Sequence, residues 1–276
     1  MVKKTLSFIG AVVVRKQKFL LFMLLGLLMM IVACDKQEEA ETKPVHVKNE
    51  KKHEKKQKEK EEKEEEKSMN LMDKQLLLSA TLGDTETAMK LIKDGANINV
   101  TGDQGETPIM AATYHNHVET VKALIEAGAD IELQDKKQDN PFLYASTEGY
   151  VDIVRLTIDA GTNTREINRS GGTALIPAAE RGQIEVVKEL LNRTDIDVNY
   201  KNDLGWTALL EAIVLGNGSE NHKQIVQLLI GHGADVNMAD REGVTPLQHA
   251  EKRGFKEIIN MLKVAGANEI IKQPTE

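Results

Sequence analysis

One interval of constant length recurs between residues 95 and 268 of the chain. Five short glycine turns mark it: Gly95-Ala96-Asn97, Gly128-Ala129-Asp130, Gly161-Thr162-Asn163, Gly233-Ala234-Asp235 and Gly266-Ala267-Asn268. The step from Gly95 to Gly128 equals the step from Gly128 to Gly161, and the step from Gly233 to Gly266 has the same length. A second series, Thr107-Pro108, Asn140-Pro141, Thr173-Ala174, Thr207-Ala208 and Thr245-Pro246, keeps this interval at first and lengthens toward its end. Two independent landmarks with one period predict a solenoid of stacked repeats, in which each repeat contacts only its neighbours.

Each repeat carries signals for two helices. Thr107 and Thr245 stand before a proline, which is typical of a helix N-terminus, because threonine caps the helix and proline has no N–H to leave unpaired. The first helix is expected to end at a residue that tolerates the left-handed conformation: Asn116, Gly149, Gly182 or Gly254. The second helix has apolar residues at helical spacing, as at Val121, Leu124 and Ile125. One repeat cannot bury this stripe alone, so it must pack on the next repeat.

Two segments contain the whole pattern: Asp103 to Glu132 (DQGETPIMAATYHNHVETVKALIEAGADIE) and Asp240 to Glu269 (DREGVTPLQHAEKRGFKEIINMLKVAGANE). They resemble ankyrin repeats, and the resemblance extends over roughly residues 70 to 270. It implies an all-α solenoid of about six helix-turn-helix repeats with β-turn tips. The ankyrin-repeat domain is expected at 69–271, with a tail at 272–276 and repeats at 69–101, 102–134, 135–167, 168–201, 202–239 and 240–271. The first and last repeats should be caps with one polar face each.

Some positions depart from this pattern. Gln138 stands where the turn of another repeat has glycine, the stretch 192–197 (NRTDID) replaces a Gly-Ala-Asp turn with a longer one, and the stretch 216–222 (GNGSENH) lengthens a link between two helices.

A different composition precedes the repeats. Phe19 to Ala33 is an uncharged run, about 22 Å long as a helix. A bilayer core of about 30 Å needs about 20 residues, so the run is short for a membrane anchor and typical of a signal-peptide core. It ends in Ile31-Val32-Ala33-Cys34, which resembles the lipobox of bacterial lipoproteins. That resemblance implies a cleaved signal peptide at 1–33 and a lipid on Cys34, the only cysteine. The alternative is an uncleaved anchor with an incidental cysteine.

Residues 34–68 are expected to form a Lys/Glu-rich spacer. Asn49 to Ser68 contains no apolar or aromatic residue, so it cannot bury enough surface to offset its ordering entropy. Lys and Glu at i,i+4 spacing favour partial helix, each pair adding a few tenths of a kcal/mol. As a coil the spacer spans roughly 30–35 Å, enough to hold the repeats off a membrane surface.

Charge and motif content exclude several function classes. The net charge is −7, and without the five bases of residues 1–33 it becomes −12, from 31 bases against 43 acids. This balance argues against general nucleic-acid binding. No nucleophile with a base, no metal-ligand spacing and no phosphate-binding glycine loop occurs, and His115 and His117 are interpreted as surface turn residues. The sequence therefore predicts no catalytic site, cofactor, metal or small-molecule ligand.

The family resemblance implies binding of a protein through the turn tips and the exposed face of the short helices. The candidate partner-binding residues are Asp203, Leu204, Trp206, Val214, Leu215, Tyr114, Glu180 and Arg181. Trp206 is the only tryptophan, and buried aromatic residues often dominate interfaces. The alternative is that Trp206 packs on the neighbouring turn as a structural residue.

These observations predict a lipid-anchored, extracytoplasmic membrane protein that acts as an adaptor or scaffold for an unknown protein partner. The alternative is an immunity-type inhibitor of a secreted toxin or an envelope enzyme.

Overall fold

The structure, a computed structural model, describes residues 71–268 of the chain. Contacts divide the chain into two parts, Met1–Lys58 and Glu59–Glu276, and the described residues all belong to the second part. The predicted signal peptide, Cys34 and the spacer lie outside the described residues.

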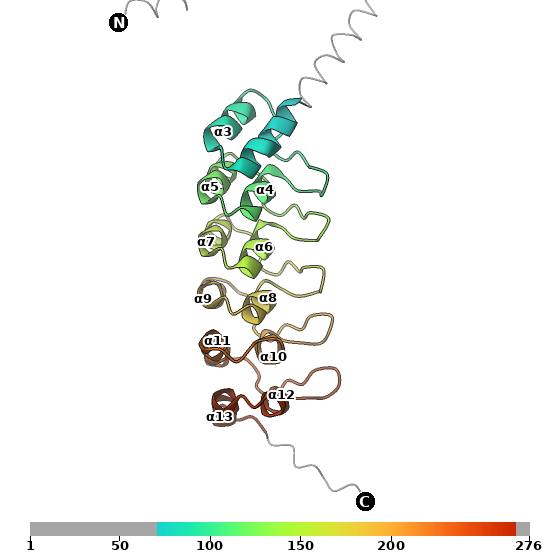
Figure 1. Cartoon of the computed structure of the whole chain (residues 1–276), viewed down its shortest axis with the longest axis vertical. Coiled ribbons are helices and arrows are strands. Elements are labelled where there is room, and N and C mark those ends of the chain that lie inside the picture. The colour runs from blue at the N-terminus through green and yellow to red at the C-terminus, as the bar shows by residue number, and fades with distance from the viewer. Residues whose placement is uncertain (1–70, 269–276) are drawn as a thin grey trace, which may run out of the picture. The chain divides into compact units, whose positions relative to one another are not determined.

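Residues 71–268 form a stack of six helix pairs, which we number repeats 1 to 6 (Figure 1). The first helix of each pair lies in an inner column, next to the loops: residues 71–82, α4 (Pro108–Tyr114), α6 (Pro141–Glu148), α8 (Leu175–Glu180), α10 (Ala208–Val214) and α12 (Pro246–Arg253). The second helix lies in an outer column: α3 (Thr85–Lys93), α5 (Val118–Glu126), α7 (Val151–Asp159), α9 (Ile184–Arg193), α11 (Glu220–Gly231) and α13 (Lys256–Val264). The described part contains no strand, and the predicted solenoid is confirmed.

The helix caps predicted at Thr107 and Thr245 are confirmed, and Asn140 and Thr207 cap α6 and α10 in the same way. The Thr107 hydroxyl accepts the N–H of Met110 at 3.4 Å, and Thr245 forms a capping box with Gln248. The exception is α8, where Ala174 takes the cap position in a helical conformation and no side chain caps the helix. The hydroxyl of Thr173, which would cap by analogy with the other repeats, is buried without a hydrogen-bond partner among the described residues.

The departures from the repeat pattern have local explanations. Asn116 (φ 54°) and Gln138 (φ 62°) are the only non-glycine residues with positive φ in the described part of the chain. Gln138 therefore occupies the left-handed conformation that Gly105 (φ 78°) holds in the preceding repeat. In repeat 4 the glycine turn after the outer helix is absent, and Thr194 is extended there instead. Its hydroxyl donates to the Leu190 carbonyl at 2.6 Å, which satisfies a helix-end carbonyl.

Most of the stack shares one apolar core, and a smaller separate cluster lies in repeat 1. Val121, Leu124, Val187 and Leu190 of the outer helices are fully buried, as their spacing predicts. They belong to one continuous cluster with the inner-helix residues. From α4 to α12 each inner helix contacts the next inner helix, and from α3 to α13 each outer helix contacts the next outer helix. Because every repeat buries its stripe on its neighbours, the stability of the domain resides in the interfaces between repeats.

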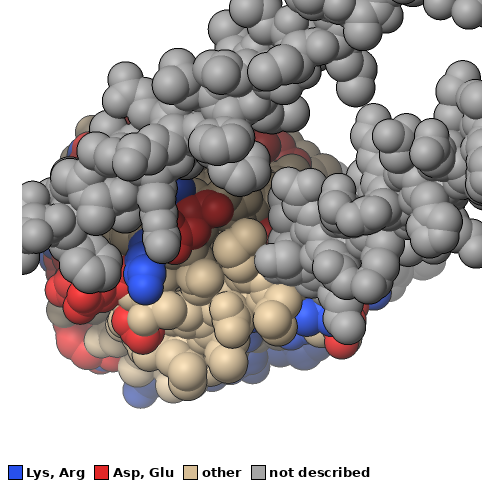
Figure 2. Space-filling model, turned by 90° about the horizontal axis from the view of Figure 1, so that it is seen from above, with Lys and Arg blue, Asp and Glu red and all other residues tan. Residues whose placement is uncertain are grey.

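The prediction of a polar face on the first repeat is wrong. Leu71, Leu78 and Leu82 are 57%, 57% and 67% exposed, and their spacing puts them on one side of the first inner helix. Figure 2 looks along the stack from this end and shows uncharged residues gathered there with charged residues around them.

Candidate partner-binding surface

The loops that connect the repeats end in tips, the turns that project beside the inner helices (Figure 1). In repeats 3 to 6 one Asp or Asn at the base of each tip accepts two backbone N–H groups of that tip. These residues are Asp135, Asn168, Asn202 and Asp240, with acceptor distances from 2.8 to 3.1 Å. In repeat 2, where this position is Gly102, the carboxylate of Glu106 accepts the N–H of Gln104 instead. Each tip is thus held in one conformation by its own side chain.

Neighbouring tips are also joined to each other. The N–H of Lys136 donates to the carbonyl of Gln104 at 2.9 Å, and the N–H of Asp203 donates to that of Ser170 at 3.0 Å. The Lys136 ammonium adds a bond to the Asp103 carbonyl at 2.7 Å. These bonds join the tips of repeats 2 and 3 and the tips of repeats 4 and 5, so a partner binding there need not order these loops first.

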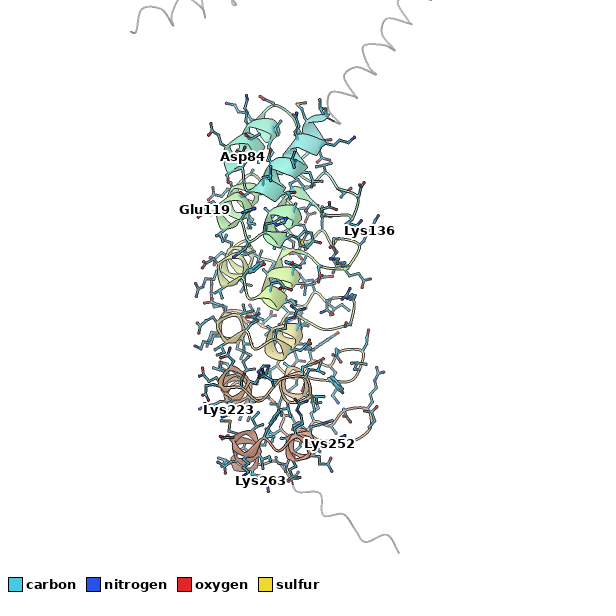
Figure 3. The ribbon with its side chains drawn as sticks, in the orientation of Figure 1. Asp84, Glu119, Lys136, Lys223, Lys252 and Lys263 are labelled. Carbon is cyan, nitrogen blue, oxygen red and sulfur yellow. The ribbon has the colours of Figure 1, made fainter. Side chains whose placement is uncertain are left out.

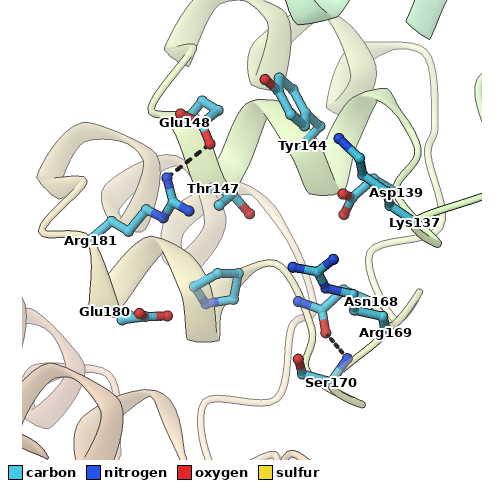
Figure 4. A pocket seen from close by; sticks show the side chains of 11 residues that line it. Lys137, Asp139, Tyr144, Thr147, Glu148, Asn168, Arg169, Ser170, Glu180 and Arg181 are labelled. Atoms are coloured by element: carbon cyan, nitrogen blue, oxygen red, sulfur yellow. Dashed lines mark hydrogen bonds and ion pairs between the residues drawn. The ribbon is translucent and has the colours of Figure 1, made fainter. Parts of the chain in front are cut away.

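A pocket of about 390 Å³ lies between the tips and inner helices of repeats 3 and 4 (Figure 4). We call it the tip pocket, and it is lined by Lys137, Asp139, Tyr144, Thr147, Glu148, Asn168, Arg169, Ser170, Pro177, Glu180 and Arg181. Three of these are basic and three acidic, so no single charge dominates. Such a lining suits the mixed polar groups of a polypeptide better than a phosphate backbone, which needs a uniformly basic surface.

The charges of the tip pocket are partly neutralised within it. Arg181 of repeat 4 pairs with Glu148 of repeat 3 at 2.9 Å (Figure 4). Burial and the nearby Asp135 charge raise the pKa of Asp139, and Arg169 and Lys137 oppose that rise. The carboxylate of Glu180 has no hydrogen bond or ion pair among residues 71–268, which leaves it available at the pocket wall.

A set of tyrosines borders the tip pocket on the side of repeat 2. Tyr114 and Tyr144 pack edge to face with ring centroids 4.7 Å apart, and Tyr144 also contacts Tyr150 at 6.3 Å. Lys137 lies over the Tyr114 ring, 5.7 Å from its centroid. Burial and the hydroxyl's hydrogen bond to Asp135 raise the pKa of Tyr114, so the hydroxyl stays protonated and donates to the carboxylate.

The predicted binding residues fall into two groups. Glu180 and Arg181 line the tip pocket, and Tyr114 packs against Tyr144 at its border. The other five belong to repeat 5 and do not line the pocket: Asp203, Leu204, Trp206, Val214 and Leu215. Leu204 is 55% and Leu215 is 51% exposed, whereas Trp206 and Val214 are half-buried. Their role in binding stays a prediction.

Sequence reasoning missed three kinds of residue. The Asp or Asn at the base of the tips could have been found, because it stands five residues before Asn140, Thr173, Thr207 or Thr245 in four consecutive repeats. Tyr144 occupies an inner-helix position at which the sequence pattern does not distinguish a buried residue from an exposed one. In the sequence Glu211 is not distinguishable from an ordinary exposed acid on a helix surface, but in the structure it is only 4% exposed.

The outer column carries charged side chains that pair across repeats. Arg155 of α7 binds Glu189 of α9 at 2.8 Å, and Arg193 of α9 binds Asp159 of α7 at 2.5 Å. Figure 3 shows Glu119 and Lys223 on this column, away from Lys136 at a tip. The acceptor Glu189 has a lowered pKa because Arg155 donates to it, and Arg193 adds to this effect. The outer column thus satisfies many of its own charges and is a suitable place for control substitutions.

A second cavity of about 360 Å³ lies beside the longer turn of repeat 4. It is lined by Thr164, Arg165, Thr173, Asp195, Ile196, Asp197 and Tyr200. Arg165 pairs with Asp195 at 2.6 Å, so its charge is satisfied within the protein. Over residues 71–268 no group of three or more His, Cys, Asp or Glu side chains is arranged to hold a metal ion. Within the same range no helix has both the length and the apolar character needed to cross a bilayer.

Comparison with known proteins agrees with the repeat architecture described above. A family model described as "Ankyrin repeats (3 copies)" matches residues 75–168, 142–238 and 201–273. An ankyrin repeat domain from Acinetobacter baumannii AYE has a similar structure, with a TM-score of 0.68 and 47% identity over 70% of this chain and 98% of that one. The ankyrin repeat domain of Bcl-3, a member of the IkappaB protein family, has a TM-score of 0.64 at 25% identity, covering 70% of this chain and 86% of that one.

The putative ankyrin repeat protein YahD of Escherichia coli K12 is 54% identical over 81 residues, which are 29% of this chain and 40% of YahD. The chain thus spans less than half the length of the curated relatives it matches.

Proposed function

Because this chain belongs to the ankyrin repeat family, we propose that it is a protein-binding module, an adaptor or scaffold that holds its partner along the tips and inner helices. Ankyrin repeats are generally protein–protein interaction modules. We place the contact at the tip pocket and the adjoining tip of repeat 5. A lipid on Cys34 would tether the module to the outer side of the cytoplasmic membrane.

The observation that carries the binding proposal is the tip pocket itself. It lies on hydrogen-bonded, preorganised tips, and it offers the Glu180 carboxylate together with Arg169 and Arg181. Next to it in the array, repeat 5 exposes Leu204 and Leu215. Mixed charges beside exposed apolar side chains are typical of a protein interface with an apolar centre and a polar rim.

The tether rests on the sequence. An uncharged run too short to span a bilayer ends at the lipobox-like Ile31-Val32-Ala33-Cys34, and two acyl chains supply stable membrane attachment without a transmembrane helix. The charged residues 34–68 then serve as a spacer between the membrane and the repeats.

Affinity capture from native membranes tests the binding proposal. The full chain is expressed with a C-terminal tag in its own host, and captured proteins are quantified by mass spectrometry. The double variant Leu204→Ser/Leu215→Ser and the single variant Arg181→Ala should lose most of a reproducibly captured partner. The control Lys122→Ala alters an exposed side chain on the outer helix α5, 62% exposed, and should retain it. Equal capture by all four proteins would contradict binding at this surface.

Fatty-acid labelling tests the tether. The wild-type chain should incorporate labelled palmitate and fractionate with membranes, whereas Cys34→Ala should do neither. Cys34→Ala protein that still incorporates label would refute attachment at this sulfur.

A further inference from the structure

Glu211 of α10 is a buried acid with an incomplete set of hydrogen bonds. Its side chain is 4% exposed. One carboxyl oxygen, Oε1, accepts from the Asn202 side-chain amide at 2.7 Å. The other, Oε2, is buried and has no hydrogen-bond partner in the described part of the chain. A buried oxygen without a donor is costly, and a carboxylate can accept about four hydrogen bonds. This oxygen therefore lacks a donor.

The electrostatic surroundings make the missing hydrogen bond of Glu211 more costly. Burial raises the pKa of Glu211 to about 7, and the charge of Glu180 adds to this rise while the Asn202 hydrogen bond opposes it. The elements packed against α10 carry several other charged or titratable groups: Arg181 at the end of α8, Glu220, His222 and Lys223 on α11, and His249, Glu251, Lys252 and Arg253 on α12.

Several of these groups are engaged elsewhere. Arg181 binds Glu148, His249 binds Asp240, and Arg253 donates to the carbonyl oxygens of Val214 and Gly216. His222 contacts the backbone carbonyl of Glu180 at 2.8 Å, and Lys223 binds Glu257 at 3.3 Å. None of them supplies an opposing charge to Glu211. The charge of Glu180 therefore acts on Glu211, and no cation of these elements opposes it.

Repeat 6 shows how the same position is satisfied internally. Its equivalent of Glu211 is His249, four residues after the capping threonine. Its equivalent of Asn202 is Asp240, and His249 Nε2 lies 2.7 Å from Asp240 Oδ2. In repeat 6 the acid at one of these two positions, Asp240, is therefore paired with a base at the other, His249. Repeat 5 has an amide and an acid at these two positions, and neither is a base.

The tip of repeat 5 suits a base supplied from outside. Asn202 connects the carboxyl to the backbone of Trp206, because its Oδ1 accepts the main-chain N–H of Trp206 at 3.0 Å. Leu204 and Leu215 expose apolar surface on the same repeat. A lysine or arginine side chain combines an apolar stem with a charged head, and its head is attracted to the face of an aromatic ring.

We propose that Glu211 and Glu180 together form the receptor for a basic side chain of the protein partner, with the apolar residues of repeat 5 beside its stem. The inference rests on the proposed function and specifies the chemistry of the partner. The incoming ammonium or guanidinium donates to Oε2 of Glu211 and offsets the charge of Glu180. Oε2 is enclosed in the free protein, so the contact requires the Glu211 side chain to change its rotamer.

This contact makes binding depend on pH. Glu211 is largely protonated at pH 6 and largely ionised at pH 8, because its pKa is about 7. A cation binds the ionised form, so occupancy releases a proton. The affinity for a basic ligand should therefore rise by about tenfold from pH 6 to pH 8 and level off above that.

Peptide binding followed by intrinsic fluorescence tests the inference, because Trp206 is the only tryptophan in the chain. The probe is the synthetic peptide acetyl-Ala-Leu-Arg-Leu-Ala-amide, and its control has citrulline, a neutral isostere, in place of arginine. The arginine peptide should bind the wild-type protein at least tenfold more tightly than the citrulline peptide at pH 8. Its affinity should fall by about tenfold at pH 6.

Two variants distinguish the loss of this contact from a general change in the charge of the protein. Glu211→Gln retains an acceptor for Asn202 but cannot ionise, so it should weaken the preference for arginine and remove the pH dependence. Glu220→Gln changes an exposed acid of the same repeat on α11, 71% exposed, and should preserve both. No binding of the arginine peptide up to millimolar concentration, equal binding of the two peptides, or pH dependence that survives in Glu211→Gln would each overturn the inference.

The captured partner gives an independent readout. It should be released from the wild-type chain at pH 6 and be captured poorly by Glu211→Gln at pH 8. If Arg181→Ala and the leucine variant lose the partner but Glu211→Gln and Glu180→Gln retain it at both pH values, the proposed function stands and the basic-residue receptor is wrong.

Discussion

Replacing Glu211 by glutamine should stabilise the protein, and by an amount that depends on pH. In the folded protein the pKa of Glu211 is raised from 4.5 to about 7 by burial and by the charge of Glu180. Below pH 4.5 both the folded and the unfolded chain hold the proton, so the group does not alter the stability. As the pH rises from 4.5 to 7, the unfolded chain ionises first and stability is lost. Above pH 7 the loss is complete.

The magnitude follows from the same values. A difference from 4.5 to about 7, at about 1.4 kcal/mol for each pH unit, amounts to about 3 kcal/mol at pH 8. Glu211→Gln removes the titration and keeps a carbonyl oxygen for the Asn202 amide. The variant should therefore match the wild-type protein at pH 4 and exceed its free energy of unfolding by about 2–3 kcal/mol at pH 8.

Urea unfolding between pH 4 and pH 8 measures this difference, with circular dichroism reporting all helices and Trp206 fluorescence reporting repeat 5. The two signals must coincide, because repeat arrays can unfold in stages. Other acids titrate in both proteins, and their contributions cancel in the difference. Glu220→Gln on α11 provides the control and should show no pH-dependent difference. A Glu211→Gln effect that is constant with pH, or that grows toward acid, would refute the reasoning.

Three further substitutions test local features of the fold, each by urea unfolding at pH 7. Gln138→Gly should stabilise the protein by about 0.5–1 kcal/mol, because glycine adopts the left-handed conformation (φ 62°) without strain; a loss of stability would contradict this. Thr207→Val should lower the free energy of unfolding by about 1 kcal/mol, because it removes the helix cap. Thr173→Val should leave the free energy of unfolding unchanged or raise it, because the Thr173 hydroxyl has no partner among the described residues. Equal losses at the two sites would show that the Thr173 side chain caps its helix. Asp240→Ala should cost about 2–3 kcal/mol, because it leaves two tip N–H groups and the imidazole of His249 without their acceptor; a loss below about 0.5 kcal/mol would mean that the tip does not depend on this carboxylate.

Much of the candidate surface could be inferred from repeat position. Glu180, Arg181 and Tyr114 were predicted by their place in the repeat, and the structure puts the first two in the wall of the tip pocket and the third at its border. The tip pocket itself could not be inferred, because its volume depends on how far the tips of repeats 3 and 4 stand from α6 and α8. The assignment of Trp206 and its neighbours to an interface rests on composition alone and stays a prediction.

The sequence by itself determined the solenoid, the helix caps at Thr107 and Thr245, and the left-handed positions at the ends of the inner helices. These features depend on backbone preferences within a few residues and on repetition at a constant period, both of which are visible in a linear chain. Only the tertiary structure decided that Glu211 is buried and subject to the charge of Glu180, that Thr173 lacks a partner among the described residues, and that the first inner helix exposes leucines. Each of these depends on which side chains of an adjacent repeat, a full repeat length away in the sequence, lie against the residue. Burial and charge pairing are properties of that contact, and no local pattern in the sequence records them.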